Sequence, residues 1–450
     1  MCLLGISLIL SGCAEAPVKV GEGKIEPVLH DVTGLAPDAA DNAALKSQLN
    51  LWDVYALAVK RTETLASSAE NVLQAKTQNN QAIGAALPQI YLNGTKTWLS
   101  SNYIGTGTPN SLFNAASDTA YFSASETILS GLNEPAAIEG AEANVNVQNY
   151  TLRYQSQQLL LNVANAFYNV LALEESLQAL EKSRDLNQQT LELEKQWQVM
   201  GRSRTADVSN TQAQLMQVLA DLENDKYQLA QARETLATLA NIQPDQQLVS
   251  AETNTTPAYS ADEALTEVEN RPDVKAAAAN VEIANAQLLA AHGLHLPTLI
   301  AEGDYYLDYD KPADTNVWSV ELMASLPIFE GGQIVAQEDI AASRKRQAEM
   351  NLSLLRRTAK DDIREAYKSL VESMGETDAY QKAVDAYQQD YQDVLHDLKL
   401  NLTTNLELLQ TMTSLETTQV SYIKAKYQTL YDQLWLGVAT GELPKVDKQN

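Results

Sequence analysis

Few residues in this chain of 450 have types and spacings that could carry chemistry. Only four histidines are present, and two of them, His292 and His295, lie three positions apart, so both could face one side of a helix. A zinc site needs at least a third protein ligand, which the neighbouring sequence does not supply. There is no Cys-x-x-Cys pair, phosphate-binding glycine loop or Gly-x-Ser-x-Gly motif. We therefore expect neither an enzyme nor a resident metal or cofactor.

The clearest candidate for covalent chemistry is Cys13. The residues from Leu3 to Leu10 form an apolar run that is too short to span a bilayer and is typical of a signal peptide. The run ends in Leu-Ser-Gly-Cys at 10–13, which resembles a bacterial lipobox. This resemblance implies cleavage after residue 12 and lipid attachment at Cys13, and two or more acyl chains make membrane attachment stable. The alternative is a free cysteine that follows an ordinary cleavage site.

The charge balance argues against a nucleic-acid partner. The chain has 58 acidic residues against 32 Lys and Arg, a formal charge of -26, and its basic residues are scattered. Phosphate binding needs a positive surface, which this composition does not provide. The ordinary interpretation of the acidity is a solvated surface. The alternative is a negatively charged lumen that favours cations.

The chain contains two copies of one structural unit, and this unit must position any functional site. An offset of 209 residues aligns Leu87-Pro88 with Leu296-Pro297, and further along an offset of 200 aligns Gly131 with Gly331. Each copy predicts a helix, two strands and two long helices. The predicted organisation is a signal peptide at 1–12, a lipid-anchored extended leader at 13–50, a first repeat at 51–250 and a second repeat at 251–450.

Each Leu-Pro precedes a predicted pair of strands. The pairs are at about 89–101 with 119–129, and at about 298–309 with 317–328. In the last strand Trp318, Val320 and Leu322 alternate with Ser319 and Glu321, so one face is apolar. This alternation fits a membrane barrel, although one such hairpin alone is more often a surface ribbon. Since open sheet edges are not tolerated in hydrocarbon, four strands would need partners, and three protomers would supply twelve.

The second half of each repeat predicts a helical hairpin, at about 135–243 and about 333–443. Proline is absent from Ala136 to Gln243, and Gly201 lies near the middle of that stretch. Sixty helical residues extend about 90 Å, which is beyond the span of an ordinary domain. An antiparallel coiled-coil spacer would explain the hairpins alone, but it would not explain the duplicated strand pairs.

Together these features resemble the TolC family of outer-membrane efflux proteins over about residues 51–443. The lipobox, the two copies, each Leu-Pro, and the glycines at Gly131 and Gly331-Gly332 carry the resemblance. The implied fold is mainly α with a membrane β-barrel: a duplicated helix-strand-strand-helix-helix unit whose trimer joins a 12-stranded barrel to a 12-helix periplasmic coiled-coil tunnel. The implied function is the exit duct of a tripartite efflux or type I secretion system. The expected location is the cell outer membrane, lipid-anchored and extending into the periplasm.

The resemblance also assigns a role to the two helical turns. Turns at this place in the family dock a periplasmic adaptor, often through a Val-Gly-Leu-like sequence, from which this chain departs. The docking residues implied here are Gly201, Arg202, Ser203, Arg204, Asn401, Leu402 and Thr403. The expected partners are two further copies of the chain, the adaptor, an inner-membrane pump and outer-membrane lipid.

Just past its turns the family has a constriction lined by acidic residues one helical turn apart. The matching aperture positions are Asp207, Asn210, Glu407 and Gln410. Three copies would bring like charges together, which costs energy unless cations or the guanidinium groups of Arg202 and Arg204 lie nearby. The alternative is that Asp207 and Glu407 are first-turn acids that stabilise helix dipoles.

Two other classes of protein share part of this pattern. A lipid-anchored periplasmic adaptor also has a helical hairpin, but usually a single one between two β-rich halves. A structural coiled-coil lipoprotein would need no duplicated strand pairs. Both stay as alternatives to the channel.

Overall fold

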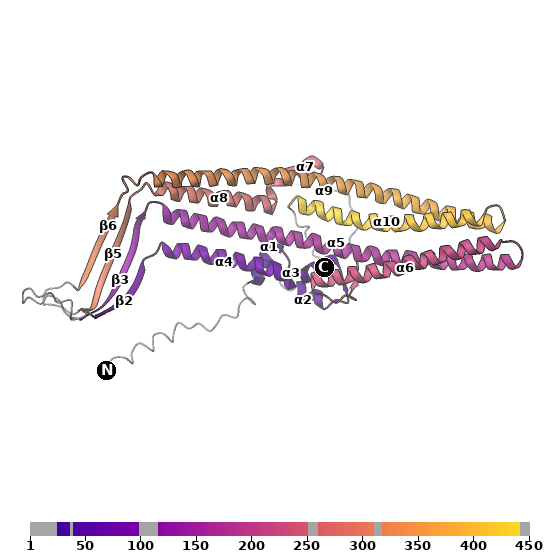
Figure 1. The fold of residues 1–450 in the computed structure, drawn as a ribbon, viewed down its shortest axis with the longest axis horizontal. Helices are drawn as coiled ribbons and strands as arrows, with labels where there is room; N and C mark the ends of the chain where they lie inside the picture. Colours follow the sequence, from indigo (N-terminus) through magenta and orange to yellow (C-terminus); the bar gives the residue numbers. More distant parts are fainter. Residues whose placement is uncertain (1–24, 37–38, 99–115, 251–259, 310–316, 442–450) are drawn as a thin grey trace, which may run out of the picture. The chain divides into compact units, whose positions relative to one another are not determined.

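Helices dominate the structure, a computed structural model (Figure 1). It describes residues 25–36, 39–98, 116–250, 260–309 and 317–441. The predicted signal peptide and Cys13 lie outside the described residues. The chain divides into two compact units, each with segments of both repeats. Counting only the described residues, the first unit lies within 25–70, 150–275 and 355–441, and the second lies within 71–149 and 276–354.

The described part of the predicted leader is not extended, which corrects the expectation for residues 25–50. It forms helices α1 (Ile25–Thr33) and α2 (Ala39–Ala44) and the short strand β1 (Gln48–Leu49). Both helices bury apolar side chains: Val28, Leu29, Ala40 and Ala43. Pro27 lies in the first turn of α1, where proline is tolerated. Burial of apolar side chains therefore stabilises helices in a segment that was expected to be extended.

The first helix of each repeat is interrupted near its start. In repeat one α3 (Leu51–Arg61) is followed by α4 (Glu63–Ala85), with Thr62 extended between them. In repeat two α7 (Ala261–Thr266) and a 3₁₀ turn (Glu267–Asn270) precede α8 (Pro272–Gly293). The residue before a proline avoids the helical conformation, which explains the second interruption. Strand β4 (Gln247–Leu248) pairs in parallel with β1 in the first unit.

Two long helical hairpins complete the repeats. Helices α5 (Asn133–Val199) and α6 (Thr205–Ala240) form the first hairpin, and α9 (Gln333–Lys399) and α10 (Asn405–Ala439) form the second. Their turns lie at 200–204 and 400–404. None of the described helices is both long and apolar enough to cross a membrane.

The second unit holds an antiparallel sheet in the order β2-β3-β5-β6. Its strands are β2 (Gln89–Trp98), β3 (Ala116–Ser130), β5 (Thr298–Tyr309) and β6 (Trp318–Ser325). Strand β6 ends three residues before the predicted position 328. The residues after Ser325 meet no strand in the described chain, so β6 ends there. The equivalent strand of repeat one, β3, continues to Ser130 because it pairs with β5 that far.

Candidate functional site at the helical turns

The two helical turns share one backbone conformation. Gly201 has φ +71° and Asn401, 200 positions later, has φ +57°. The next amides also match, because Arg202 donates to the carbonyl of Trp197 at 2.8 Å and Leu402 to the carbonyl of Asp397 at 2.9 Å. Glycine and asparagine are the residues that adopt this left-handed conformation most easily. The repeats therefore end in equivalent turns despite different sequences.

Arg202 joins the two turns. Its Nη2 donates to Asn401 Oδ1 at 3.2 Å and lies 3.5 Å from the Lys399 carbonyl oxygen. The same guanidinium lies 5.4 Å from the ring centre of Trp197. Arg202, which the sequence placed in the adaptor-docking set, thus holds the turn of one hairpin against that of the other.

The first turn is fastened by charged groups. Arg204 donates to the Asp207 carboxylate from Nε at 2.9 Å and from Nη2 at 2.8 Å, and its backbone amide donates to the same group at 3.2 Å. The Arg204 hydrogen bond holds the pKa of Asp207 below its usual range. Ser203 Oγ donates to the buried carboxylate of Glu194. Burial raises the pKa of Glu194, the Ser203 hydrogen bond opposes this shift, and the charge of Asp207 adds to it.

The second turn is fastened by the hydroxyl groups of two threonines. Thr404 caps α10, since its Oγ1 accepts the amide of Glu407 at 3.4 Å. The hydroxyl of Thr403 donates to the Glu407 carboxylate. Glu407 itself is exposed. At the position equivalent to Asp207, the Glu407 carboxylate therefore has the Thr403 hydroxyl as its partner instead of an arginine.

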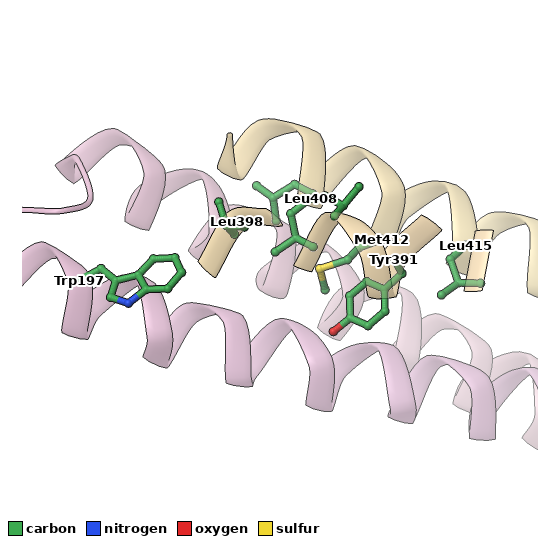
Figure 2. Packing of buried hydrophobic residues seen from close by; sticks show 8 residues of the cluster. Trp197, Tyr391, Leu398, Leu408, Met412 and Leu415 are labelled. Carbon is green, nitrogen blue, oxygen red and sulfur yellow. The ribbon is translucent and has the colours of Figure 1, made fainter. Parts of the chain in front are cut away.

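An apolar cluster packs the hairpins together behind the turns (Figure 2). Trp197 comes from α5, and the remaining members come from α9 and α10: Tyr391, Val394, Leu398, Leu408, Leu409, Met412 and Leu415. Burying one such side chain contributes about 1.5–3 kcal/mol. The cluster therefore fixes how the two turns lie against each other.

Asn405 is an anchor that sequence reasoning did not identify. It begins α10, is buried, and donates from Nδ2 to the Asp207 carbonyl and to Thr211 Oγ1, each at 3.1 Å. Thr211 in turn donates to the same carbonyl at 3.0 Å. No local signal could have found this contact, because its partners lie almost 200 residues earlier.

The ends of the hairpins expose apolar side chains. Val199 is 89% exposed and Leu402 is 72% exposed, and Met200, Leu400 and Leu406 are also largely open. Val199, Met200, Leu400 and Leu406 lie within the turns for which docking was predicted, although the seven docking residues named individually did not include them. A signal was available, because these apolar residues lie beside the turn glycine and asparagine, where the helical core pattern has ended.

The four predicted aperture positions differ in environment. Asp207 is half-buried and ion-paired, whereas Asn210, Glu407 and Gln410 are exposed. Asp207 and Glu407 each lie in the first turn of their helix. That position also satisfies the helix-dipole alternative, so both explanations stay open.

The sheet presents two chemically different faces. One face carries apolar and aromatic side chains in cross-strand rows: Ile90, Ala124, Gly303 and Val320, then Leu92, Phe122, Tyr305 and Trp318. The other carries mostly polar rows: Gln89, Ser125, Glu302 and Glu321, then Tyr91, Ser123, Asp304 and Ser319. The apolar face is exposed rather than packed, with Trp318 64% and Val320 68% open. An exposed apolar sheet face is typical of a surface that contacts a partner or lipid.

His292 and His295 both contact Glu338. Their Nε2 atoms lie 3.2 and 3.3 Å from its two carboxylate oxygens. Within the described ranges, no group of three or more His, Cys, Asp or Glu side chains is arranged to hold a metal ion. The three residues therefore form a partly exposed polar cluster.

Known proteins share this architecture. The family profile described as Outer membrane efflux protein matches residues 54–241 and 266–442, one segment for each repeat. The chain belongs to this outer membrane efflux protein family. It is 26% identical to outer membrane protein TolC of Escherichia coli K12 over 423 residues, which cover 90% of this chain and 85% of TolC.

Solved structures share the fold. The structure of CusC superimposes with a TM-score of 0.76 at 19% identity and covers 87% of this chain and 92% of CusC. The outer membrane protein VceC from Vibrio cholerae gives 0.75 at 19% identity, with 87% of this chain and 96% of VceC covered. The fold is therefore that of these solved structures: mainly helical, with a four-stranded antiparallel sheet among the described residues.

Proposed function

We propose that three copies of this chain form the outer-membrane exit duct of a tripartite efflux or secretion system. The chain is an outer-membrane channel protein of this class and extends into the periplasm. The observation that carries the assembly is the sheet: it has four strands, two open edges and one exposed apolar face. Such a sheet is stable in a bilayer only when it closes, and three copies supply twelve strands.

The two faces of the sheet have different roles in the barrel wall. The face that carries Leu92, Phe122 and Trp318 contacts lipid, because its rows are apolar and aromatic. The opposite face lines the lumen with Glu302, Asp304 and Glu321. Val320→Asp, on the lipid face, should reduce the yield of membrane-inserted protein much more than Ser319→Asp on the lumen face. Equal yields of the two variants would reject this orientation.

The ends of the hairpins dock the periplasmic adaptor, chiefly through exposed apolar side chains. Val199 and Leu402 are the anchors we assign, because burying large exposed apolar groups is the usual source of affinity at such surfaces. A photo-crosslinking residue at Val199 or Leu402 should capture the adaptor in cells. The same probe at Lys382, which is exposed on α9, is the matched control. Capture from position 382 alone would exclude docking at the turns.

Arg202 has a different role within the docking set. Because its guanidinium binds Asn401 and lies near Trp197, Arg202 positions the turns and leaves the apolar residues to contact the adaptor. Gly201, Ser203, Arg204 and Thr403 likewise shape the two turns. Arg202→Lys should therefore weaken adaptor capture less than Leu402→Glu does.

We also propose that Cys13 carries the lipid anchor. The support is the sequence Leu-Ser-Gly-Cys that ends the apolar run at 10–13. Mass spectrometry of the mature amino terminus should find an acylated Cys13. Loss of the lipid in Cys13→Ala but not in Cys2→Ala is the expected contrast, and an unmodified Cys13 in the parent protein would reject the anchor.

Conductance tests the channel directly. Purified protein added to a planar lipid bilayer should produce discrete ion-conducting steps. An adaptor or a structural lipoprotein would produce no ion-conducting steps. Absence of such steps from a membrane-inserted sample would therefore reject the duct.

A further inference from the structure

The first unit contains a cavity of about 340 Å³ where α5, α9 and α10 meet the start of α8. This volume is within the range of small-molecule binding sites. On α5 the cavity lies roughly ten helical turns from Val199, so it is separate from the docking and aperture residues at the hairpin turns. The side chains that give the cavity its chemical character are Tyr154, Tyr431, Trp435, Arg271, Asp273 and Asp362.

The charged groups of the cavity form one network around Arg271. Its Nε and Nη2 atoms donate to the two oxygens of Asp273 at 3.0 and 2.7 Å, and Nη2 also donates to Asp362 at 3.0 Å. Its Nη1 atom lies 3.4 Å from the carbonyl oxygen of Ala439. The Arg271 side chain is 9% exposed, whereas that of Asp362 is 41% exposed. The network therefore carries a net negative charge, and Asp362 is its accessible carboxylate.

Three aromatic rings line the same cavity. Tyr154 comes from α5, and Tyr431 and Trp435 come from α10. Burial raises the pKa of the Tyr154 hydroxyl, and the two aspartates raise it further against the opposing effect of the arginine. Burial also raises the pKa of Tyr431, and the charge of Asp432 adds to this shift. Both tyrosines therefore experience a negative potential beside the rings.

The interrupted helix and the hairpin that build the cavity do not require these side chains, since repeat one forms the same elements without them. At the positions equivalent to the arginine and its closer carboxylate partner, repeat one has Thr62 and Thr64. It has Asn162 in place of the accessible carboxylate, and Gln231 and Thr235 in place of the two rings on α10. The charged and aromatic set therefore serves something other than the shared fold.

We propose that this cavity binds a monovalent organic cation with an apolar body, of the quaternary ammonium class. Tryptophan and tyrosine rings attract such cations through the negative potential of their faces. The accessible carboxylate of Asp362 supplies the opposite charge beside those rings. All of these groups belong to one chain, so the site goes beyond the exit duct proposed above and does not depend on its trimer.

Other classes of ligand fit the cavity less well. An anion would meet the accessible carboxylate, while the guanidinium of Arg271 already donates to its two aspartates and to the Ala439 carbonyl. A metal ion such as Ca²⁺ or Mg²⁺ needs several oxygen ligands. The Asp273 carboxylate is already bonded to the guanidinium and to the Val274 amide, the latter at 2.9 Å. A neutral ligand would gain nothing from the negative charge.

Binding of a probe cation tests the site directly. The probe is benzyltrimethylammonium, titrated into the full chain purified in an uncharged detergent and followed by calorimetry. We expect saturable binding and a rise in melting temperature, because a ligand that binds the folded state stabilises it. Benzoate, which has the same ring and the opposite charge, is the control and should do neither. Absence of saturable binding to the folded parent protein would overturn the site.

Variants locate the bound probe. Asp362→Asn and Trp435→Leu should each weaken binding at least about tenfold, the ratio that corresponds to about 1.4 kcal/mol. Trp435→Leu leaves the ion network intact, so it tests the site even if Asp362→Asn fails to fold. Asp361→Asn is the matched control, because Asp361 is the neighbouring acid on α9, is 74% exposed and pairs with Arg364 at 2.9 Å. This control should bind the probe as the parent does.

The outcomes separate this site from the channel. Loss of binding in Asp362→Asn and Trp435→Leu, with binding kept in Asp361→Asn, supports the cavity. Equal affinity in all three variants would place the probe at other acidic groups of the chain and overturn the proposal, and so would equal binding of benzoate. A parent protein that conducts ions without binding the probe overturns this site and leaves the duct standing, whereas one that binds the probe without conducting does the reverse.

Discussion

The two hairpin turns have the same backbone and different fastenings. The first has Gly201, a buried Glu194 and the Arg204 to Asp207 ion pair, so charged groups hold it. In the second, Val394 of the apolar cluster stands where repeat one has Glu194. Duplication has therefore kept the shape of the turn while its chemistry diverged.

The backbone conformation that the two turns share therefore depends on contacts between the hairpins rather than on the contacts within either turn alone. The apolar cluster, the Arg202 to Asn401 hydrogen bond and the Asn405 contacts all join one hairpin to the other. The shifted pKa values of Glu194 and Asp207 add sensitivity to pH at the first turn.

The largest effect should come from the apolar cluster that both turns share. Leu408 is fully buried, so Leu408→Ala should destabilise the hairpin contact by about 2–5 kcal/mol. Thermal or denaturant unfolding of the purified protein measures the change. Leu406→Ala, an exposed leucine on the same helix, is the control and should stay within about 0.5 kcal/mol. Equal losses in both variants would show that the cluster does not hold the hairpins together.

Asn405 should contribute less than the cluster. Asn405→Ala removes two hydrogen bonds and leaves buried acceptors with fewer partners, which should cost about 1–3 kcal/mol. The exposed Asn210→Ala gives the baseline in the same unfolding measurement. If both asparagines prove neutral, the contact between α10 and α6 is incidental.

The pH response should distinguish the two turns. Burial raises the pKa of Glu194, so its ionisation penalises the first turn at neutral pH, and that penalty is relieved as pH falls through the raised pKa. The Arg204 hydrogen bond lowers the pKa of Asp207, so its stabilisation is lost only as pH falls further, through that lowered pKa. The protection of the amides at 200–204 against hydrogen exchange, measured relative to their intrinsic rate at each pH, should therefore be greatest in mild acid.

Substitutions identify the groups responsible for that profile. Glu194→Gln should remove the gain in protection on mild acidification, and Asp207→Asn should remove the loss at lower pH. The amides at 400–404 serve as the internal control with a flatter profile. If amide protection depended on pH in the same way at both turns, the distinction between their two sets of contacts would be contradicted.

The smallest effect should be on ion selectivity. Because Arg204 compensates the charge of Asp207 while the Glu407 carboxylate has the Thr403 hydroxyl as its partner, Glu407→Gln should lower cation preference more than Asp207→Asn. The change should be about twofold or less, since salt at about 0.1 M screens exposed charges beyond about 10 Å. Reversal potentials under a salt gradient measure it. No change in either variant would favour the helix-dipole role of both acids.

Local and repeated patterns in the sequence predicted much of this fold. The duplication, the Leu-Pro boundaries and the long stretch without proline indicated strand pairs and hairpins, and the fold class is confirmed. The strand after Val317 was predicted too long because its pattern continues to Ile328 while its pairing stops at Ser325. Alternation in a sequence reports side-chain orientation and cannot report whether a neighbouring strand is present.

The turns were only partly predictable from the sequence. Gly201 and Asn401 marked their positions, because left-handed backbone favours these residue types. The partners of Arg202, Glu194 and Asn405 were not predictable, since each depends on how side chains pack after the helices fold. The leader was mispredicted as extended because the burial of Val28 and Leu29 depends on packing that the local sequence does not show.

Imaging of the detergent-purified particle is the most direct test of the closed trimer. The account predicts threefold symmetry and a continuous wall of twelve strands, in which each β6 pairs with a neighbouring copy's β2. A monomer, or an assembly whose four-stranded sheets stay open at β2 and β6, would contradict it.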